Sequence, residues 1–460
     1  MLTKRHSFRS FFAPPEGSTF SNRKLVQIFI PVLLEQLLLN LLGLVDTMLA
    51  SALSDAATAG VSHGFIIYNV SSAIITGLAA GGSVVCAQWF GFRDLERASD
   101  AARSSLLVAL AFAVVGGVIP ILNPQGTVSL LMGEHDPEVL DYAATYLIYS
   151  SLSLPFVALI SVCTATCRAQ GNTRIPLIVS VCRLSLSLAC KFVMNNVFSM
   201  GVLGTALSNL VGVGVVSIAA FLYITVKRMD ISFRYGSRSF FDWKLIQRVV
   251  QIAVPAAIES ASLQIGLLLV QRIITGFGVA ESAAHGIASR IQPLSYLPAH
   301  CWGIVSMIVI GQCCGAGDQK LARQSVIHLM KLSYAWMIVV NIFCLLLTNS
   351  IVAFFGGSEQ TLEISRRLFR LYCWNAFFTY TTAYMLPQAL RGAGDVQYVM
   401  TVSLAVMFLA RLGLAYLLGA VLKMGTFGVW VAMTIDWAIR TVFYMVRFLN
   451  GKWLRHNITR

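Results

Sequence analysis

The sequence predicts an all-α integral membrane protein whose twelve transmembrane helices form two pseudo-symmetric bundles of six. Three observations lead to this fold class: an apolar composition, twelve apolar windows of membrane length, and a repeat that relates the two halves of the chain. Of the 460 residues, 57% are hydrophobic and 12% are charged, against roughly 45–50% and 25% in soluble domains. A soluble core cannot bury so much apolar surface, so we expect the chain to lie in a bilayer.

Twelve apolar windows of about 20 residues are long enough to cross the bilayer as helices. They lie near 26–50, 60–88, 104–122, 140–165, 175–198, 202–226, 249–274, 285–313, 325–348, 364–388, 397–421 and 426–448. Five segments follow from this division: an N-terminal tail at 1–24, a six-helix lobe at 25–226, a linker at 227–248, a second six-helix lobe at 249–448 and a C-terminal tail at 449–460.

The positions of Lys and Arg predict the orientation of these helices. The formal net charge is +14, but the basic residues lie in short loops rather than on one face, which argues against a nucleic-acid partner. They cluster before the first window and after the even-numbered ones, for example at Arg93, Arg174 and Arg391. Because cytoplasmic loops are enriched in Lys and Arg, we expect a multi-pass protein of the plasma (inner) membrane with both termini in the cytoplasm.

The two halves of the chain repeat one plan. A shift of 224 residues superposes Pro31 on Pro255, Glu35 on Glu259, Gln88 on Gln312 and Asp94 on Asp318. Two sets of six helices in the same sense are typical of alternating-access transporters, although a duplicated bundle without transport would show the same repeat. No G-x-x-x-x-G-K-[ST] motif is present to bind ATP, which favours transport driven by an ion gradient.

Ionisable side chains inside the apolar windows are candidates for the site, because a charge in hydrocarbon costs several kcal/mol and is usually functional. Glu35 and Asp46 share the first window and lie 11 residues apart, which is about three helical turns, on one stripe. At ~1.5 Å per residue, Glu35 and Glu259 each lie about 16 Å from the basic residue that precedes their helix, near the midplane. Asp436 and Arg440 are spaced to form an ion pair within one helix.

The chain resembles the multidrug and toxic compound extrusion (MATE) family over nearly its whole length. The residues that carry the resemblance are IPVLLEQLLLNLLGLVDTMLAS, AAGGSVVCAQWFGFRD, IGQCCGAGDQKLARQ, ALRGAGD and MGTFGVWVAMTIDW. The resemblance implies export of organic, often cationic compounds in exchange for H+ or Na+. It also implies that Asp46, in its V-D-T context, is the functional acid of the first span. An acid in a partly dry site can load and release a proton, and an organic cation would compete for the same charge.

The remaining site candidates come from departures from the family pattern. Where some proton-driven relatives have a second acid in span 5, this chain has Asn195 and Asn196, with Lys191 nearby. Where sodium-driven relatives have acids in span 10, it has Tyr380 and two threonines. The predicted ion-coupling and substrate-binding set is therefore Asp46, Glu35, Glu259, Asn195, Asn196 and Tyr380. Basic residues within the spans (Arg183, Lys191 and Arg411) leave an amphiphilic or anionic substrate open.

These observations predict a secondary-active antiporter that exports amphiphilic, cationic organic compounds by alternating access. We expect no enzymatic activity, no cofactor and no bound metal apart from Na+ near Asp46 if sodium is the coupling ion, with H+ favoured over Na+. The expected partners are small organic substrates, the coupling cation and the bilayer, and the expected functional unit is a monomer. Two alternatives remain: a lipid-linked precursor flippase of the same superfamily, and a membrane receptor or enzyme that does not transport.

Overall fold

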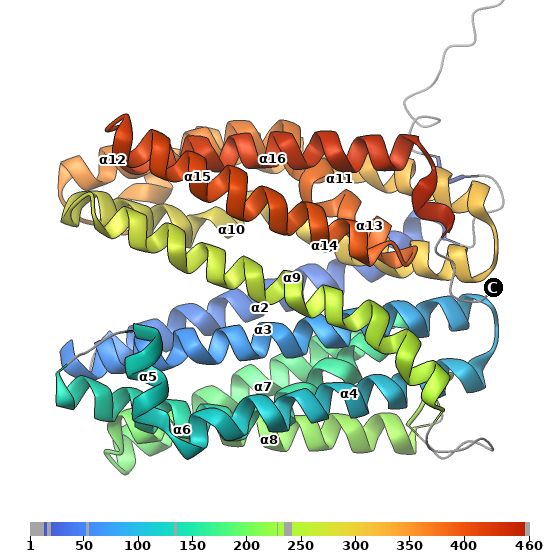
Figure 1. Ribbon diagram of the computed structural model, residues 1–460, viewed down its shortest axis with the longest axis horizontal. Coiled ribbons are helices and arrows are strands. Elements are labelled where there is room, and N and C mark those ends of the chain that lie inside the picture. The colour runs from blue at the N-terminus through green and yellow to red at the C-terminus, as the bar shows by residue number, and fades with distance from the viewer. Residues whose placement is uncertain are drawn as a thin grey trace, which may run out of the picture. The chain divides into compact units, whose positions relative to one another are not determined.

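The computed structural model describes residues 13–15, 20–51, 55–132, 136–227, 229–233 and 242–455, without the side chains of 41–51, 55, 58, 131 and 132. Every regular element in this part of the chain is a helix (Figure 1), which confirms the all-α prediction. Contacts divide the chain into an N-terminal unit, Leu34–Gln264, and a C-terminal unit, Met1–Leu33 with Ile265–Arg460. The two boundaries fall inside the helices Asn22–Ser51 and Trp243–Thr275. The first half of each of these helices therefore belongs to a different unit from its second half. The lobe boundaries drawn from the sequence remain a prediction.

The N-terminal unit is built from long helices joined by short turns. They are the second half of α2 (Asn22–Ser51), α3 (Asp55–Gly91), α4 (Leu95–Leu122), α5 (Pro124–Met132), α6 (Pro137–Ala169), α7 (Arg174–Phe192) with the π-helix η1 (Val193–Val197), α8 (Gly201–Val226) and the first half of α9 (Trp243–Thr275). Helix α3 contacts α4 and α6, and α8 contacts α6 and α7.

Glycines on α3 allow a close approach to the first half of α9. A Cβ at Gly77 would lie 2.7 Å from Ala257 Cα, and one at Gly81 would lie 2.4 Å from Ala253 Cα. Small residues spaced by four are the usual means of bringing two helices into contact inside a membrane. The first half of α9 is therefore packed tightly into the N-terminal unit.

The C-terminal unit contains the second half of α9 and the helices that follow it. These are α10 (Val279–Gly315), α11 (Gln319–Ala353), α12 (Glu359–Asn375), η2 (Ala376–Met385), α13 (Leu386–Gly392), α14 (Val396–Ala405), η3 (Val406–Arg411), α15 (Leu412–Ala415), η4 (Tyr416–Val421), α16 (Gly425–Leu449) and the short 3-10 turn η5 (Lys452–Arg455). The first half of α2 packs here as well, because Phe29 stacks on Trp302 with ring centroids 4.5 Å apart. Asn22 Oδ1 lies 2.8 Å from His328 Nε2.

Ten helices of the described residues are long and apolar enough to cross a membrane. They match ten of the twelve predicted windows. The other two windows, 26–50 and 364–388, coincide with α2 and with the continuous run α12–η2–α13. The short helix α5 was not predicted from the sequence, although Pro124 at its start and Asn123 Oδ1, which accepts from the Gly126 N–H at 2.9 Å, form an ordinary N-terminal cap.

Backbone geometry confirms the internal repeat. Asp94 and Asp318 cap their helices with φ/ψ of −94°/86° and −90°/85°. The turn before α8 has φ of 52° at Ser199, and the turn before α16 has φ of 55° at Lys423. Non-glycine residues rarely adopt this left-handed conformation, so the same departure at equivalent positions shows that the two turns share one design.

The repeat offset falls from 224 to 223 between Asp94 and Arg168 and returns to 224 by Met200, and the structure gives a reason for the return. Arg168 matches Arg391 at a shift of 223 residues, whereas Met200 matches Met424 at 224. Between these positions the C-terminal half contains the π-helix η3, which has no counterpart in α7. A π-turn has i→i+5 hydrogen bonds and so accommodates an additional residue. Beyond η3, each residue of the N-terminal half is therefore matched 224 positions later.

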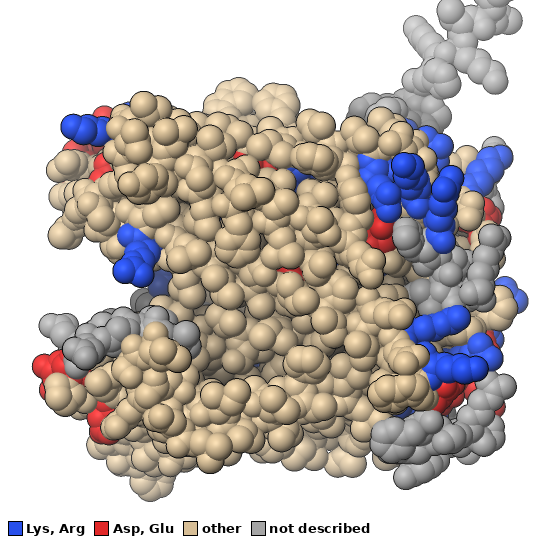
Figure 2. Space-filling view, in the orientation of Figure 1, with Lys and Arg blue, Asp and Glu red and all other residues tan. Residues whose placement is uncertain are grey.

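Charged side chains on the face shown in Figure 2 lie near the helix ends, and the middle of the face is almost free of them. This is the distribution expected where helix flanks meet polar headgroups and helix centres meet hydrocarbon.

Candidate functional site

Glu35 is buried in the N-terminal unit and is already paired. One carboxylate oxygen, Oε1, lies 2.5 Å from an Arg168 guanidinium nitrogen and accepts a hydrogen bond from Ser180 Oγ at 3.4 Å. Its side chain is 3% exposed, and that of Arg168 is 21% exposed. Glu35 lies beside the last turn of α6, which contains Arg168, and beside α7, which contains Ser180. The carboxylate of Glu35 thus connects α2 with α6 and α7.

Asp46 and Glu259 complete the predicted acids. Asp46 lies in α2, but its side chain falls outside the described residues. Glu259 lies half-buried in α9, in the half of that helix that belongs to the N-terminal unit. The role of each acid in ion coupling stays a prediction.

Asn195 and Asn196 lie in η1, the π-helical end of the fifth span. Asn195 Nδ2 donates to Thr205 Oγ1 of α8 at 3.1 Å. Asn195 Oδ1 is buried and has no hydrogen-bond partner among the described residues. A buried amide oxygen without a donor is costly, which makes it an available acceptor. Asn196 is exposed, whereas Asn195 is partly buried, so the structure gives different surroundings to two residues that the sequence grouped together.

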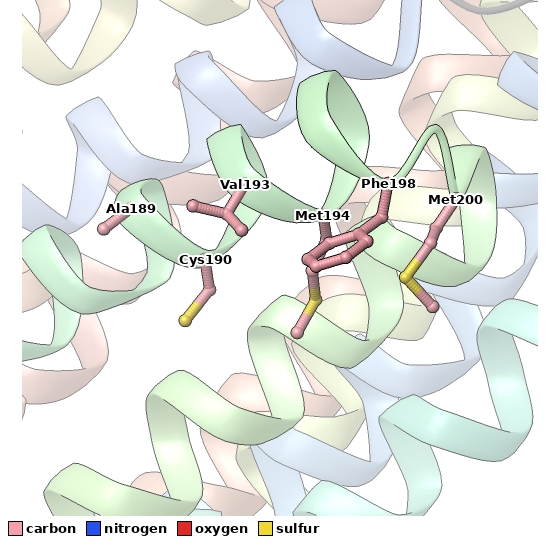
Figure 3. A pocket seen from close by; sticks show the side chains of 6 residues that line it. All are labelled: Ala189, Cys190, Val193, Met194, Phe198 and Met200. Atoms are coloured by element: carbon pink, nitrogen blue, oxygen red, sulfur yellow. The ribbon is translucent and has the colours of Figure 1, made fainter.

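An apolar cavity of about 430 Å³ adjoins these residues. It is lined by Ala189, Cys190, Val193, Met194, Phe198 and Met200. In Figure 3 the side chains of Cys190, Met194, Phe198 and Met200 point in the same direction. Volumes of about 300–1,000 Å³ are typical of small-molecule sites, and unbranched methionines adapt to ligands of different shape.

The C-terminal unit buries a charged cluster of three residues. Arg440 Nε donates to Asp436 Oδ1 at 2.6 Å, which confirms the ion pair predicted from their spacing. Arg411 Nη1 lies 3.5 Å from Asp436 Oδ2, and Arg440 Nη2 donates to the Ser403 carbonyl oxygen at 3.2 Å. The Asp436 side chain is 0% exposed. Two guanidinium groups thus surround one carboxylate and leave this cluster with one net positive charge.

Tyr380 belongs to an aromatic stack in the same unit. Its ring stacks on Tyr384 at 4.3 Å and on Tyr296 at 5.5 Å between centroids, and it meets Trp437 edge-on at 5.2 Å. Trp437 Nε1 donates to Tyr384 Oη at 3.1 Å. Because Tyr380 is only 4% exposed, its ring serves in packing here, and its role in substrate binding stays a prediction.

Sequence reasoning missed the partner of Glu35. In the sequence, Arg168 lies just after the fourth apolar window, among the basic residues that predict the orientation of the helices. The available signal was the repeat itself, since Glu35 and Arg168 recur as Glu259 and Arg391 at nearly the same shift. Acids and bases that recur together in both halves suggest structural pairs. Asp46 and Lys191, which are replaced by Val270 and Ala415 in the second half, do not follow that pattern.

The chain is similar to known proteins over most of its length. The MatE family model matches residues 31–193 and 255–417, which are the two halves of the repeat. A probable multidrug resistance protein NorM of Thermotoga maritima is 25% identical over 98% of this chain and 97% of its own. The multidrug and toxin extrusion protein 2 of Mus musculus is 22% identical over 94% of this chain and 74% of its own.

A solved structure shares the fold. It is described as the outward-facing conformation of a multidrug resistance MATE family transporter of the MOP superfamily, and it matches with a TM-score of 0.85 and 20% sequence identity over 93% of this chain and 94% of its own. Because the family model covers both halves of the repeat, the chain belongs to the MATE family of multi-pass membrane transporters.

Proposed function

We propose that this transporter exports amphiphilic organic cations from the cytoplasm in exchange for H+, with Asp46 as the carboxylate at which proton and substrate compete. The observation that carries the proposal is the asymmetry of the first spans. The family model covers both halves, yet Asp46 of span 1 is matched by Val270 in span 7, which is 4% exposed in an apolar cluster. An acid kept in only one of two equivalent helices has a specific task.

The surroundings of η1 support an amphiphilic substrate. The apolar cavity suits the hydrocarbon or aromatic part of such a molecule, and the orphaned Asn195 Oδ1 could accept a hydrogen bond from its polar part. The names of the relatives, which describe multidrug resistance and extrusion, agree with this substrate class. The positions of Lys and Arg favour a plasma-membrane protein with both termini in the cytoplasm, and we propose that the monomer is the functional unit.

H+ is the proposed coupling ion because Asp46 is the one acid that matches the family pattern. Asn195 and Tyr380 stand at positions where some relatives have a second acid. Transport of ethidium in proteoliposomes tests this choice. A pH gradient and a sodium gradient are imposed separately, each with a protonophore control. Transport driven by the pH gradient alone and abolished by the protonophore is the expected result. Transport driven by the sodium gradient at constant pH would overturn H+ coupling.

A further inference from the structure

Lys191 is among the largest fully buried side chains of the described residues, at 1% exposed. It lies on the buried face of α7, which also contains Ser180 and Ser187. A buried ammonium group is stable only when a carboxylate or several acceptors compensate its charge. The position of α7 relative to α2 indicates which carboxylate this is.

The hydrogen bond between Ser180 and Glu35 fixes the register of the two helices. Asp46 lies 11 residues after Glu35 in α2, and Lys191 lies 11 residues after Ser180 in α7. Eleven residues make about three turns, a rise of about 16 Å and a rotation of about 20°. Both helices cross in the same sense as odd-numbered spans. Asp46 and Lys191 therefore stand at the same level and at corresponding register positions of neighbouring helices.

The internal repeat gives a second, independent argument. At the offset of 224 residues, Asp46 corresponds to Val270 and Lys191 to Ala415. In the C-terminal unit, Val270 and Ala415 are both buried members of one apolar cluster. The two positions thus belong to one packed cluster in the half where both side chains are described. Both are charged, with opposite sign, in the N-terminal half, and both are apolar in the C-terminal half.

We propose that Lys191 is the built-in counter-cation of Asp46, and that a proton or a cationic substrate replaces its ammonium group at this carboxylate. The nature of these two competitors rests on the proposed function, whereas the pair itself does not. When Asp46 takes up a proton, the Lys191 ammonium loses its partner. The Asn195 Oδ1 atom lies four residues further along the same helix and has no hydrogen-bond donor among the side chains and backbone that the structure describes, so it offers the ammonium an alternative acceptor.

Built-in competition has a defined consequence for substrate binding. In the empty transporter the carboxylate is already compensated, so an organic cation must displace Lys191 in order to bind. Removal of the ammonium group should therefore strengthen binding of a cation and have little effect on a neutral ligand. Coupling energies between sites of this kind typically correspond to roughly 5–150-fold in affinity.

The test uses the purified full chain in detergent, with ethidium binding measured by fluorescence and thermal stability by tryptophan emission. Lys191→Met is expected to lower the Kd of ethidium by at least about fivefold. Arg183→Met, which removes a cation from the same helix, is the matched control and should leave the Kd unchanged. A Kd that is unchanged or raised in Lys191→Met, measured well below the melting temperature of that variant, would overturn the proposal.

A double-mutant cycle tests the pair without reference to transport. Asp46→Asn and Lys191→Met should each lower the Tm, because each leaves a buried charge, and the double variant should recover most of the loss. If a single variant fails to fold, Lys191→Arg is used in its place. It keeps the positive charge, so its Tm should remain close to that of the wild type. Additive losses in the double variant would show that the two residues do not form a pair. This outcome is distinct from a failure of H+ coupling, which the gradient experiment detects.

Discussion

In the N-terminal half of the chain, positions 46 and 191 are an aspartate and a lysine; in the C-terminal half, the equivalent positions are Val270 and Ala415 within an apolar cluster. The C-terminal half instead buries Asp436 between Arg411 and Arg440, where the N-terminal half has no acid. The caps and turns of the two halves nevertheless match to within a few degrees of φ. The two halves thus share one backbone design, and each half has its own buried charges.

The comparison assigns different roles to the two sets of charges. In the C-terminal half, the carboxylate of Asp436 has one close hydrogen-bonded arginine and a second arginine at 3.5 Å. A fully compensated carboxylate of this kind holds helices together and has little capacity to exchange ions. In the N-terminal half, the proposed pair leaves a single lysine to be displaced, with Asn195 Oδ1 as a second acceptor. The half with fewer compensating groups is the one suited to exchange.

The largest effect is expected for Asp436→Asn. This change leaves Arg411 and Arg440 buried without a counter-charge, and the free energy of unfolding should fall by about 3–5 kcal/mol. Chemical denaturation followed by tryptophan fluorescence measures the loss. Asp94→Asn is the matched control, because the ion pair of Asp94 with Arg97 is 33% and 45% exposed and should contribute under about 1 kcal/mol. Similar losses for the two variants would contradict a structural role for the Asp436 cluster.

Glu35→Gln sharpens the distinction between a structural and a coupling acid. It removes the charge that compensates Arg168, and stability should fall by about 1.5–3 kcal/mol. Ethidium transport per folded molecule should keep its dependence on the proton gradient. Ser180→Ala, which deletes only a 3.4 Å hydrogen bond to the same carboxylate, should have a smaller effect on stability. Normal stability together with lost proton coupling in Glu35→Gln would make Glu35 the coupling acid instead.

Gly204 and Gly428 are equivalent positions with different neighbours. A Cβ at Gly428 would lie 2.7 Å from the backbone carbonyl of Leu418, whereas one at Gly204 would lie 2.4 Å from the side-chain oxygen of Asn195. Gly428→Ala must shift backbone and should cost about 1–3 kcal/mol of stability. In Gly204→Ala, rotation of the Asn195 side chain can relieve the close contact, so this variant should lose less stability. Because the rotation moves Asn195 Oδ1, it should weaken ethidium binding instead. Thermal melts and ethidium titrations of both variants separate the two outcomes, and equal stability losses would count against this difference.

The smallest effect is expected for the matched helix caps. Asp94 accepts from the Arg97 N–H at 3.0 Å, and Asp318 accepts from the Leu321 N–H at 2.8 Å. Asp94→Ala and Asp318→Ala should each lower stability by about 1 kcal/mol. The losses should agree to within about 1 kcal/mol, because the cap geometry is the same in both halves and the exposed ion pair of Asp94 with Arg97 adds less than that. A clear difference in the denaturation midpoints of the two variants would show that the repeat does not extend to energetics.

Much of the fold could be predicted because membrane helices show long apolar windows, and every one of the twelve coincides with helix in the structure. The ion pair of Asp436 with Arg440 was predictable from an i, i+4 spacing. Long-range pairing was not: nothing local to Arg168 indicates that its guanidinium contacts a residue 133 positions earlier in the chain. The π-helices escaped prediction for a related reason, since they place one extra residue within an apolar run whose composition does not change.

For the site residues too, the sequence predicts which side chains are candidates, and the structure shows which partners they have. The sequence makes Asn195 a candidate because it stands where some relatives have an acid, and the structure adds its contact with Thr205, which depends on how α7 and α8 pack. Tyr380 was singled out in the same way, but its neighbours prove to be other aromatic rings. Chemistry can be inferred from residue type, whereas compensation by a partner has to be seen in three dimensions.

The most direct test of the account is proton-driven ethidium transport in proteoliposomes that contain equal amounts of folded wild type, Asp46→Asn, Glu35→Gln or Glu259→Gln. The account predicts that Asp46→Asn alone loses transport driven by the pH gradient, while the two glutamate variants retain it. Transport by Asp46→Asn at the wild-type rate, with the same dependence on the pH gradient, would contradict it.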